Sequence, residues 1–365
     1  MTLTTLPPPH HEPVAPHDLR ARVTDVLLRF IDDQDQILRD VDPELSTMTT
    51  ALREFVLSSG KRLRSTFCYW GWRGAGGAPD DEGILVAASA LELLQGCALI
   101  HDDVMDSSDT RRGLPTMHRR FARWHRLGDL HGSPEEFGTS VAILLGDLCL
   151  SWCAQMFDGC GLSEAAISRA KPAFHQMHTE LMAGQYLDLL GPARGGGSSE
   201  RARLIIDYKT ARYTVGRPLE LGALLADGGP ELRARYAAYA RPLGEAFQLR
   251  DDVLGVFGDT ERTGKPAGDD LRAGKHTVMM DLTRSRATAA QRAVLDALFG
   301  NPDLDRDGIG KIQDIIRETG ALASVNALIE EHRTAALSHL TDSLLETETQ
   351  ATLTELAITV TNRDY

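Results

Sequence analysis

The spacing of apolar residues constrains the fold of this chain more than any other feature. From Asp18 nearly to the C-terminus, leucines, alanines and other apolar residues recur with the period of a helix, and strand-like alternation is missing. Breaks such as 74–79 and 192–198 join segments of similar composition, which indicates loops between helices. The sequence predicts one all-α domain of ten or more helices over residues 18–365, preceded by a disordered Pro- and His-rich tail over residues 1–17.

Charge and cysteine usage exclude several classes of protein. The formal net charge of −13 argues against a nucleic-acid-binding surface. Pro7, Pro8 and Pro9 interrupt the N-terminal segment before an apolar signal sequence forms, and the best candidate for a membrane span, Val141–Trp152, is short and contains Asp147. The five cysteines show no paired C-x-x-C spacing, which favours reduced, buried thiols. We therefore expect a soluble, cytoplasmic protein with no nucleic-acid partner and no membrane span.

Three aspartates end a strongly apolar segment. Residues 87–100 are almost wholly apolar and lead directly into Asp102, Asp103 and Asp106. On a helix, Asp102 and Asp106 share a face and repel each other, so a bound cation would stabilise them. A solvated acidic face is the usual alternative for a run of charges, but a helix as apolar as this one is expected to be buried. Carboxylates suit Mg²⁺, which takes its remaining ligands from water and from substrate phosphates.

A second pair of aspartates, Asp251 and Asp252, also lies inside an apolar helical pattern. If the two clusters face each other, they form a site for several cations. Arg111 and Arg112 follow the first cluster, and guanidinium groups match phosphate oxygens. The two clusters therefore predict a metal-dependent site for a substrate that carries phosphates.

Several ordered motifs between Leu52 and Thr277 resemble those of the trans-isoprenyl diphosphate synthases, the polyprenyl synthetase family. The first aspartate cluster matches the family's D-D-x-x-D motif, and Arg111-Arg112-Gly113 matches the R-R-G that follows it. G-K-R-x-R occurs at 60–64, G-Q-x-x-D at 184–188 and K-T at 209–210. The resemblance implies an isoprenoid synthase fold, in which helices surround a central active-site cavity, and a homodimer.

The resemblance also implies a role for each matching residue. Isopentenyl diphosphate would be bound by Lys61, Arg64, Gln95 and Arg112. The allylic diphosphate would be bound by Arg111, Gln185, Asp188, Lys209 and Lys265. Three Mg²⁺ ions, bound with the allylic diphosphate, would take their ligands from Asp102, Asp103, Asp106, Asp251 and Asp252. The catalytic set would comprise Asp102, Asp106, Arg111, Lys209, Thr210, Gln248, Asp251 and Lys265, with Thr210 and Gln248 near the developing carbocation.

The second cluster departs from the family's pattern, because Gly255 takes the place of a third aspartate. The site thereby loses one carboxylate. The resemblance implies that the first aspartate of this motif is the main ligand, so we expect the enzyme to remain active. We expect the change to Gly255 to affect the binding of the third ion.

The implied reaction is the Mg²⁺-dependent condensation of isopentenyl diphosphate with dimethylallyl, geranyl or farnesyl diphosphate. Cys97 and Ala98, five and four positions before Asp102, are small where short-chain members of the family often carry Phe or Tyr, and Leu94 lies one turn deeper. We therefore expect an open chain-length pocket and geranylgeranyl diphosphate (C20) as the product, and we expect Cys97→Phe to shorten it towards C15. A farnesyl (C15) product and products of C25 or longer are the alternatives within the family.

Two other functions compete with this interpretation. A class I terpene cyclase also ionises a prenyl diphosphate with an aspartate-rich helix and Mg²⁺, but its second metal motif is normally N-x-x-x-S-x-x-x-E, and it has no use for a basic site at Lys61 and Arg64. A non-catalytic subunit of a heteromeric synthase tends to lose aspartates from the first cluster, which this chain keeps.

Overall fold

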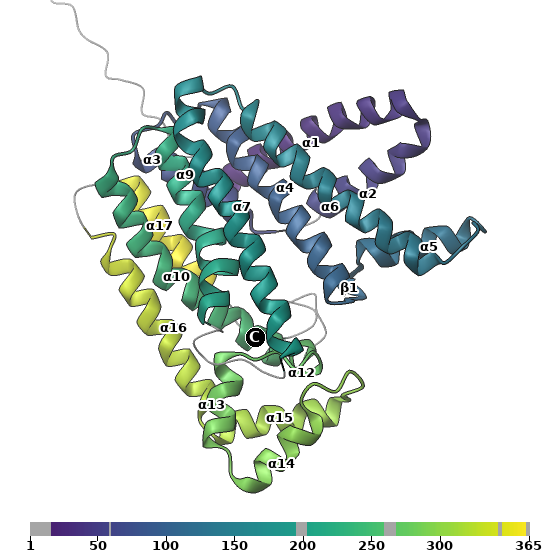
Figure 1. Cartoon of the computed structure of the whole chain (residues 1–365). Helices are drawn as coiled ribbons and strands as arrows, with labels where there is room; N and C mark the ends of the chain where they lie inside the picture. The colour runs from purple at the N-terminus through teal and green to yellow at the C-terminus, as the bar shows by residue number, and fades with distance from the viewer. Residues whose placement is uncertain (1–15, 58–59, 195–202, 259–267, 342–344, 363–365) are drawn as a thin grey trace, which may run out of the picture.

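The computed structural model describes residues 16–57, 60–194, 203–258, 268–341 and 345–362 (Figure 1). The tail predicted for residues 1–17 lies outside this part of the chain, apart from its last two residues, which already belong to the first helix.

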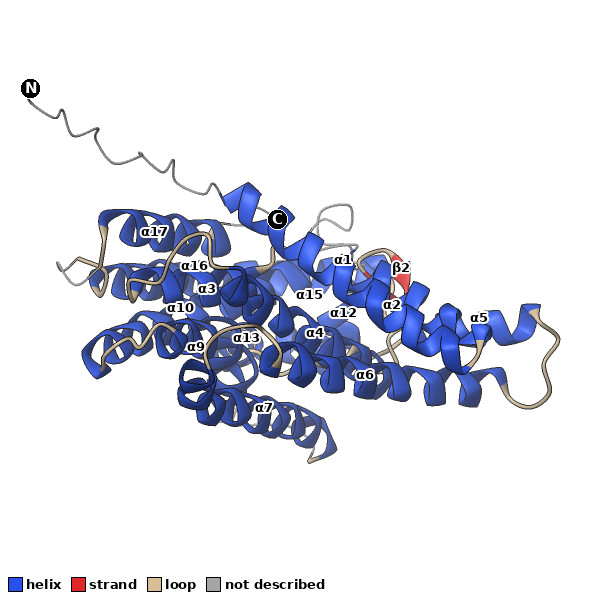
Figure 2. Cartoon of the chain, turned by 90° about the horizontal axis from the view of Figure 1, so that it is seen from above, coloured by secondary structure: helices blue, strands red, loops and turns tan. Residues whose placement is uncertain are grey.

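The first half of the chain forms α1 (Pro16–Val41), the 3₁₀-helix η1 (Pro43–Leu45), α2 (Ser46–Leu57), α3 (Leu63–Gly74), α4 (Glu82–Met105), β1 (Thr110–Arg111), β2 (Leu114–Pro115), α5 (Met117–Leu127) and α6 (Pro134–Asp158). The second half forms α7 (Glu164–Ala193), the π-helix η2 (Ile206–Gly216), α9 (Arg217–Leu225), α10 (Pro230–Phe257), α12 (Asp269–Arg272), α13 (Val278–Arg286), α14 (Ala289–Leu298), α15 (Arg306–Glu318), α16 (Ala321–Ser338) and α17 (Thr347–Thr361). The predicted all-α fold with more than ten helices is confirmed. In the described part of the chain, the one exception is the short hairpin of β1 and β2, which the sequence did not predict (Figure 2).

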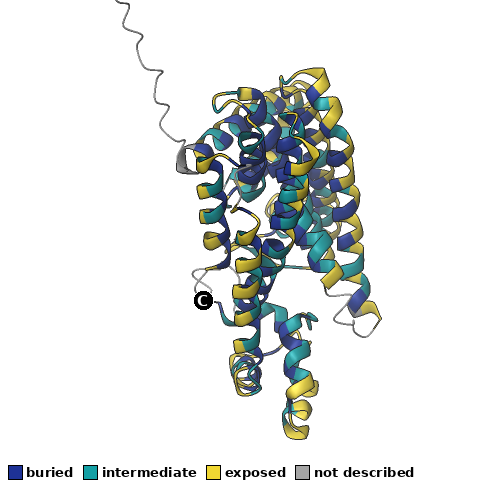
Figure 3. Cartoon of the chain, turned by 90° about the vertical axis from the view of Figure 1, so that its left-hand side faces the viewer, coloured by how far each residue is buried: buried dark blue, intermediate teal, exposed yellow. Residues whose placement is uncertain are grey.

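The central element is α4, because most residues of this helix between Ile84 and Ile100 are apolar. Its N-cap residue Asp81 accepts a hydrogen bond from the backbone N–H of Gly83, and its buried positions include Leu91, Leu94 and Ile100, all with no exposed surface. The helix packs most extensively against α6. Buried residues face the inside of the helical bundle and exposed ones its outside (Figure 3). The apolar segment that precedes the first aspartate cluster is therefore a core helix, as predicted.

Two helices, α4 and α6, are long and apolar enough to cross a membrane by length and composition. In α4, 78% of the most apolar stretch is buried inside the structure, so this helix is accounted for as core. In α6 the corresponding share is 39%, and Ile143 and Leu144 are among the apolar side chains that remain exposed.

Residues from the end of α10 to α16 form a second apolar cluster. The helices α12 to α15 of this cluster lie at the bottom of Figure 1. The end of α10 contributes Leu249 and Val253, and α15 and α16 contribute residues such as Ile312 and Val325. Because the other half of α10 belongs to the main core, this helix connects the two clusters. It thereby holds the second aspartate pair over the same space that the end of α4 reaches.

Candidate active site

A cavity of about 760 Å³ lies between α2, α3, α4, α7, η2 and α10. Its polar lining contains most of the residues that the sequence singled out: Lys61, Arg64, Gln95, Asp102, Arg111, Arg112, Gln185, Lys209, Thr210, Gln248 and Asp251. A smaller cavity of about 90 Å³ adjoins it, because Lys209, Thr210 and Gln248 line both, and it adds Asp188 and Asp252. Residues far apart in the sequence are thus brought to one place. Lys265 lies outside the described residues.

Helical spacing decides which aspartate of the first cluster faces the cavity. Glu92, Gln95, Leu99 and Asp102 line it from α4, three or four residues apart and therefore on one face. Asp103 is rotated away from this face, has no exposed surface and accepts a hydrogen bond from the Nε of Arg111 at 2.7 Å. The hairpin of β1 and β2, which pairs Arg111 with Leu114, holds that guanidinium beside the end of α4.

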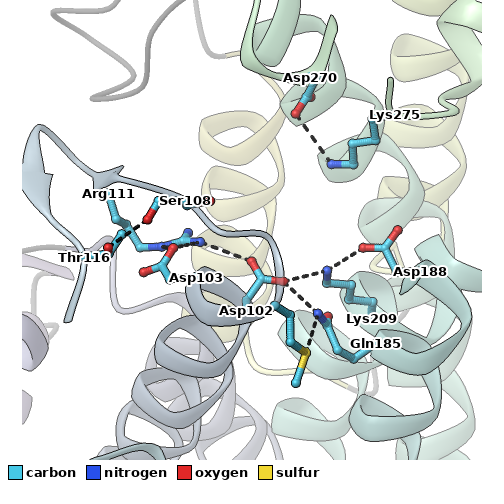
Figure 4. Close-up of polar contacts among 11 residues, drawn as sticks. Asp102, Asp103, Ser108, Arg111, Thr116, Gln185, Asp188, Lys209, Asp270 and Lys275 are labelled. Carbon is cyan, nitrogen blue, oxygen red and sulfur yellow. Dashed lines mark hydrogen bonds and ion pairs between the residues drawn. The ribbon is translucent and has the colours of Figure 1, made fainter. Parts of the chain in front are cut away.

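Asp102 is the centre of a network of charges (Figure 4). Its Oδ2 accepts a hydrogen bond from Nη2 of Arg111 at 3.1 Å, and its Oδ1 accepts one from Nε2 of Gln185 at 2.9 Å and another from Nζ of Lys209 at 3.1 Å. Burial alone would raise the pKa of this carboxyl, but the cations of Lys209 and Arg111 outweigh it, so the pKa lies below its ordinary value. Asp102 is therefore a carboxylate at neutral pH.

Asp106 is in the opposite situation. It is the C-cap residue of α4 and exposed at its surface, yet lost hydration and the negative charge of Asp102 raise its pKa. A cation placed beside Asp102 and Asp106 would relieve this repulsion.

Lys209 bridges two helices. Besides Asp102 on α4, its Nζ donates a hydrogen bond to Oδ2 of Asp188 on α7 at 2.6 Å. Burial would lower the pKa of this amine, but the two carboxylates raise it above its ordinary value, so the side chain stays charged. The G-Q-x-x-D and K-T motifs thus meet at the first aspartate cluster, as the resemblance implies (Figure 4).

Two glycines allow η2 to approach its neighbours closely. A Cβ added at Gly184 of α7 would lie 2.8 Å from the backbone N of Lys209, and one added at Gly244 of α10 would lie 2.2 Å from Cα of Ala211. Both distances are shorter than van der Waals contact. The π-helix that carries Lys209 and Thr210 is therefore seated between two helices at positions where only glycine fits. Local π-helical geometry is often associated with functional sites.

A chain of hydrogen bonds runs from η2 to the second aspartate pair. Oγ1 of Thr210 donates to Oε1 of Gln248 at 2.6 Å, and Nε2 of Gln248 donates to Oδ1 of Asp252 at 2.8 Å. Asp252 is buried, and burial raises its pKa to about 7. Asp251 instead lines the main cavity together with Asp102. The two aspartates of this pair therefore face different surroundings, which the sequence alone did not separate.

Asp270 occupies the space beside Gly255. A Cβ added at Gly255 would lie 2.1 Å from Oδ2 of Asp270, so the carboxylate of Asp270 stands where the side chain of a third aspartate would begin. Oδ1 of Asp270 is 3.9 Å from Nζ of Lys275, which lines both cavities (Figure 4). The charge of Asp270 raises the pKa of Lys275. Neither Asp270 nor Lys275 was predicted from the sequence as a site residue.

Three cations that line the cavity, Lys61, Arg64 and Arg112, form its basic end. Nη2 of Arg64 donates to Oγ1 of Thr214 at 2.9 Å, and its guanidinium stacks on the ring of Tyr213, with 4.2 Å from the guanidinium carbon to the ring centroid. Lost hydration and the neighbouring Arg111 lower the pKa of Arg112. This crowding of like charges favours the binding of an anion there.

The predicted chain-length residues divide between the cavity wall and the core. Ala98 lines the cavity, whereas Cys97 and Leu94 have no exposed surface and do not line it. Cys97 points towards His101 of its own helix, with 3.8 Å between Sγ and Nδ1. Ala98 is therefore the residue of the three that bounds the open space directly, and a role for the other two stays a prediction.

The residues present fit Mg²⁺ bound jointly with phosphates. In the described part of the chain, no three His, Cys, Asp or Glu side chains gather into a metal cage of their own. The cavity instead offers separate carboxylates, Asp102 on one side and Asp251 on the other, beside cationic side chains. Mg²⁺ is typically held by one or two carboxylates, with water and substrate phosphates as its remaining ligands.

Comparison with known proteins agrees with this arrangement. The sequence model of the family described as polyprenyl synthetase matches residues 46–316. A geranylgeranyl pyrophosphate synthase from Corynebacterium glutamicum, crystallised with isoprenyl diphosphate and magnesium, is 41% identical, with a TM-score of 0.90 over 96% of this chain and 98% of that one. A geranylgeranyl diphosphate synthase of Saccharolobus solfataricus is 29% identical over 76% of this chain and 79% of its own length. A (2E,6E)-farnesyl diphosphate synthase of Mycobacterium tuberculosis is 28% identical over 83% of this chain and 80% of its own length.

Proposed function

Because this chain belongs to the polyprenyl synthetase family and is a trans-prenyltransferase, we propose that it condenses isopentenyl diphosphate with an allylic diphosphate to make geranylgeranyl diphosphate. The observation that carries this proposal is that two groups of charged side chains line one cavity. Lys61, Arg64 and Arg112 form its basic end, and the carboxylates of Asp102 and Asp251 line it together with Lys209 and Lys275. Two different diphosphates, one bound with metal and one without, suit such a cavity.

The end near Asp102 receives the allylic diphosphate. Arg111, Lys209 and Lys275 hold its phosphate oxygens and stabilise the negative charge that grows on the diphosphate as the allylic C–O bond breaks. Bound Mg²⁺ supplies Lewis-acid stabilisation of the same charge. Three ions are expected, and Asp102, Asp106 and Asp251 are the ligands that we propose for them.

Asp103 and Asp252 are not proposed as metal ligands, because each accepts a hydrogen bond from another residue of the site. Asp103 is committed to Arg111, and Asp252 fixes the amide of Gln248. The ligand set proposed here is therefore narrower than the five aspartates expected from the sequence. Thr210 and Gln248 line the cavity. Their side-chain oxygens would face the carbocation that is left when the diphosphate departs.

The basic end holds isopentenyl diphosphate through Lys61, Arg64, Gln95 and Arg112. Its double bond attacks the carbocation and forms the new C–C bond. The resulting cation loses a proton, which the released diphosphate accepts. Such a scheme needs no nucleophilic side chain, and the cysteines agree with this, because burial raises the pKa of Cys97 to about 11 and that of Cys149 still further.

A C20 product is supported by two observations. Ala98 leaves the cavity wall beside α4 open, and the 41%-identical structure is a geranylgeranyl pyrophosphate synthase. A C15 product or one of C25 and longer is the alternative. A homodimer is supported by the exposed apolar side chains Ile143 and Leu144 on α6 and Met182 and Tyr186 on α7. A cytoplasmic location is part of the proposal.

The decisive experiment incubates the purified protein with Mg²⁺, isopentenyl diphosphate and one allylic primer at a time: dimethylallyl, geranyl or farnesyl diphosphate. Chromatography of the dephosphorylated products is expected to show a C20 alcohol and the consumption of isopentenyl diphosphate. Release of diphosphate from the primer with no consumption of isopentenyl diphosphate would identify a cyclase instead. No reaction with any primer would refute the proposal.

A further inference from the structure

A carboxylate lines the basic end of the cavity, where it would be expected to repel a diphosphate. Glu92 lies on the cavity face of α4, one turn before Gln95, and is 7% exposed. Its Oε2 accepts a hydrogen bond from Nη1 of Arg62 at 3.1 Å, and the side chain of Arg62 is only 4% exposed. The pair is therefore a buried ion pair, and each charge depends on the other, because an uncompensated buried charge is strongly unfavourable.

Arg62 is an unusual start for a helix. It is the N-cap residue of α3 and has left-handed backbone angles, φ 50° and ψ 39°, which are uncommon for any residue other than glycine. Asp, Asn, Ser and Thr are preferred at this position because their side chains accept hydrogen bonds from the first turn. A guanidinium has no acceptor, and Arg62 makes no capping hydrogen bond with its side chain.

Glu92 supplies the missing cap from a neighbouring helix. Its Oε1 accepts a hydrogen bond from the Oγ of Ser65 at 2.9 Å and lies 3.4 Å from the backbone N of Ser65, the third residue of α3. A carboxylate at this point also interacts favourably with the helix dipole. One side chain of α4 therefore fixes both the left-handed residue Arg62 and the first turn of α3.

Two cations of the basic end lie within two residues of Arg62 in the sequence. Lys61 precedes it, and Arg64 follows in the first turn of α3, where it is directed to Thr214 and Tyr213. The direction of both side chains depends on the backbone angles of Arg62. Since Arg62 neutralises Glu92, the carboxylate can lie in an anion-binding end without cancelling the charge of Lys61, Arg64 and Arg112.

We propose that Glu92 is a positioning residue of the isopentenyl diphosphate site. It acts through Arg62 and the N-terminus of α3, and it sets the directions of Lys61 and Arg64 without itself contacting the diphosphate. This inference rests on the proposed function, because it assigns isopentenyl diphosphate to the basic end.

The test measures the KM for isopentenyl diphosphate and the KM for the allylic primer separately, together with kcat and Tm. Glu92→Gln keeps the size of the side chain and removes its charge. We expect the KM for isopentenyl diphosphate to rise by about 10- to 100-fold, since small misplacement of binding groups has effects of this order, while the KM for the primer stays unchanged. Glu92→Asp keeps the charge and should recover part of the loss.

Two further variants separate positioning from general stability. Glu348→Gln breaks a second ion pair of α3, with Arg73 at its other end, 3.1 Å between Nη2 and Oε2 and away from the cavity lining. It should lower Tm without a selective effect on either KM. The double variant R62M/E92L replaces the buried pair by apolar side chains, which often restores stability. Its Tm should recover relative to Glu92→Gln, and its KM for isopentenyl diphosphate should stay raised.

The inference is overturned if Glu92→Gln changes both KM values equally or neither of them, or if R62M/E92L regains the wild-type KM along with its Tm. Should Glu92→Gln not fold, Glu92→Asp and R62M/E92L give the same comparison. A wild-type protein that does not consume isopentenyl diphosphate would refute the proposed function itself, which is a different outcome from a wild-type enzyme whose Glu92 variants lack the KM split.

Discussion

Replacing Gly184 by alanine tests whether the seating of η2 on α7 controls the reaction. The added Cβ would lie 2.8 Å from the backbone N of Lys209 and 3.2 Å from its Cα. Non-bonded carbon atoms are most stable at about 3.5–4.0 Å, so η2 has to move away by roughly 0.5–1 Å. The hydrogen bonds of Lys209 to Asp102 and Asp188, at 3.1 and 2.6 Å, cannot both absorb such a shift.

The expected effect on activity is much larger than the effect on stability. Overpacking of this kind costs about 1–3 kcal/mol. Removing a glycine from a helix interior returns about 1 kcal/mol, so the net loss in the free energy of unfolding is about 0–2 kcal/mol. A misplacement of about 1 Å at a reacting centre can cost about 100-fold in rate. We therefore expect kcat/KM for the allylic primer to fall by about 10- to 100-fold with little change in Tm.

The assay is steady-state condensation with the allylic primer varied, beside thermal unfolding of the same samples. Gly216→Ala is the matched control, because a Cβ added at Gly216, the last residue of η2, would meet Cβ of Ala240 at 3.5 Å, an ordinary contact. It should retain the activity of the wild-type protein. A Gly184→Ala variant with wild-type kcat/KM would refute the argument that close approach at Gly184 positions Lys209.

Three other outcomes follow from the same geometry. Ala98→Phe should shift the product towards C15 in the chromatographic assay, and a C20 product from this variant would remove Ala98 from the chain-length wall. The sequence alone predicts that Cys97→Phe shortens the product, but the structure places Cys97 in a fully buried site, so we now expect this variant mainly to lower Tm by overpacking. Gly255→Asp should lower kcat although it restores the family's usual motif, because the added Cβ would lie 2.1 Å from Oδ2 of Asp270. The assay measures kcat as a function of Mg²⁺ concentration, and a variant with a higher kcat than the wild-type protein would contradict this argument. Removal of Mg²⁺ with EDTA should abolish turnover but leave Tm unchanged, because Lys209 and Arg111 already neutralise Asp102. A large drop in Tm would show that the fold itself depends on the metal.

Local patterns predicted the features that depend on one helix at a time. The period of apolar residues predicted the helices, and the four-residue spacing predicted that Asp102 and Asp106 share a face of one helix. The family's motifs named residues that the fold brings to one cavity. The hairpin that turns Arg111 back towards Asp103 was not predicted, because each of its strands has only two residues and shows no alternating pattern.

Features that depend on contacts between helices were out of reach of the sequence. Glu92 is a charged residue within an apolar segment, and nothing in the neighbouring sequence indicates that its side chain caps α3. Gly255 looked like a missing ligand, because the carboxylate that fills its place comes from Asp270, beyond a loop. Asp251 and Asp252 are adjacent in the sequence and cannot be told apart by spacing, yet they face different cavities.

The ion pairs around Asp102 affect how Mg²⁺ and the diphosphate bind to the site. Asp102 is stabilised by Lys209 and Arg111, so a cation that binds Asp102 alone has to compete with both. A diphosphate that binds Lys209 alone has to compete with Asp102 and Asp188 in turn. If both bound together, each ion pair that is broken would be replaced by another, because the carboxylates would hold the metal and the amine of Lys209 would hold the phosphate. The arrangement therefore favours joint binding over binding of either component by itself, which is a thermodynamic coupling between two ligands of one site. The ion pairs in the cavity are thus the reason that the metal and the diphosphate bind better together than separately.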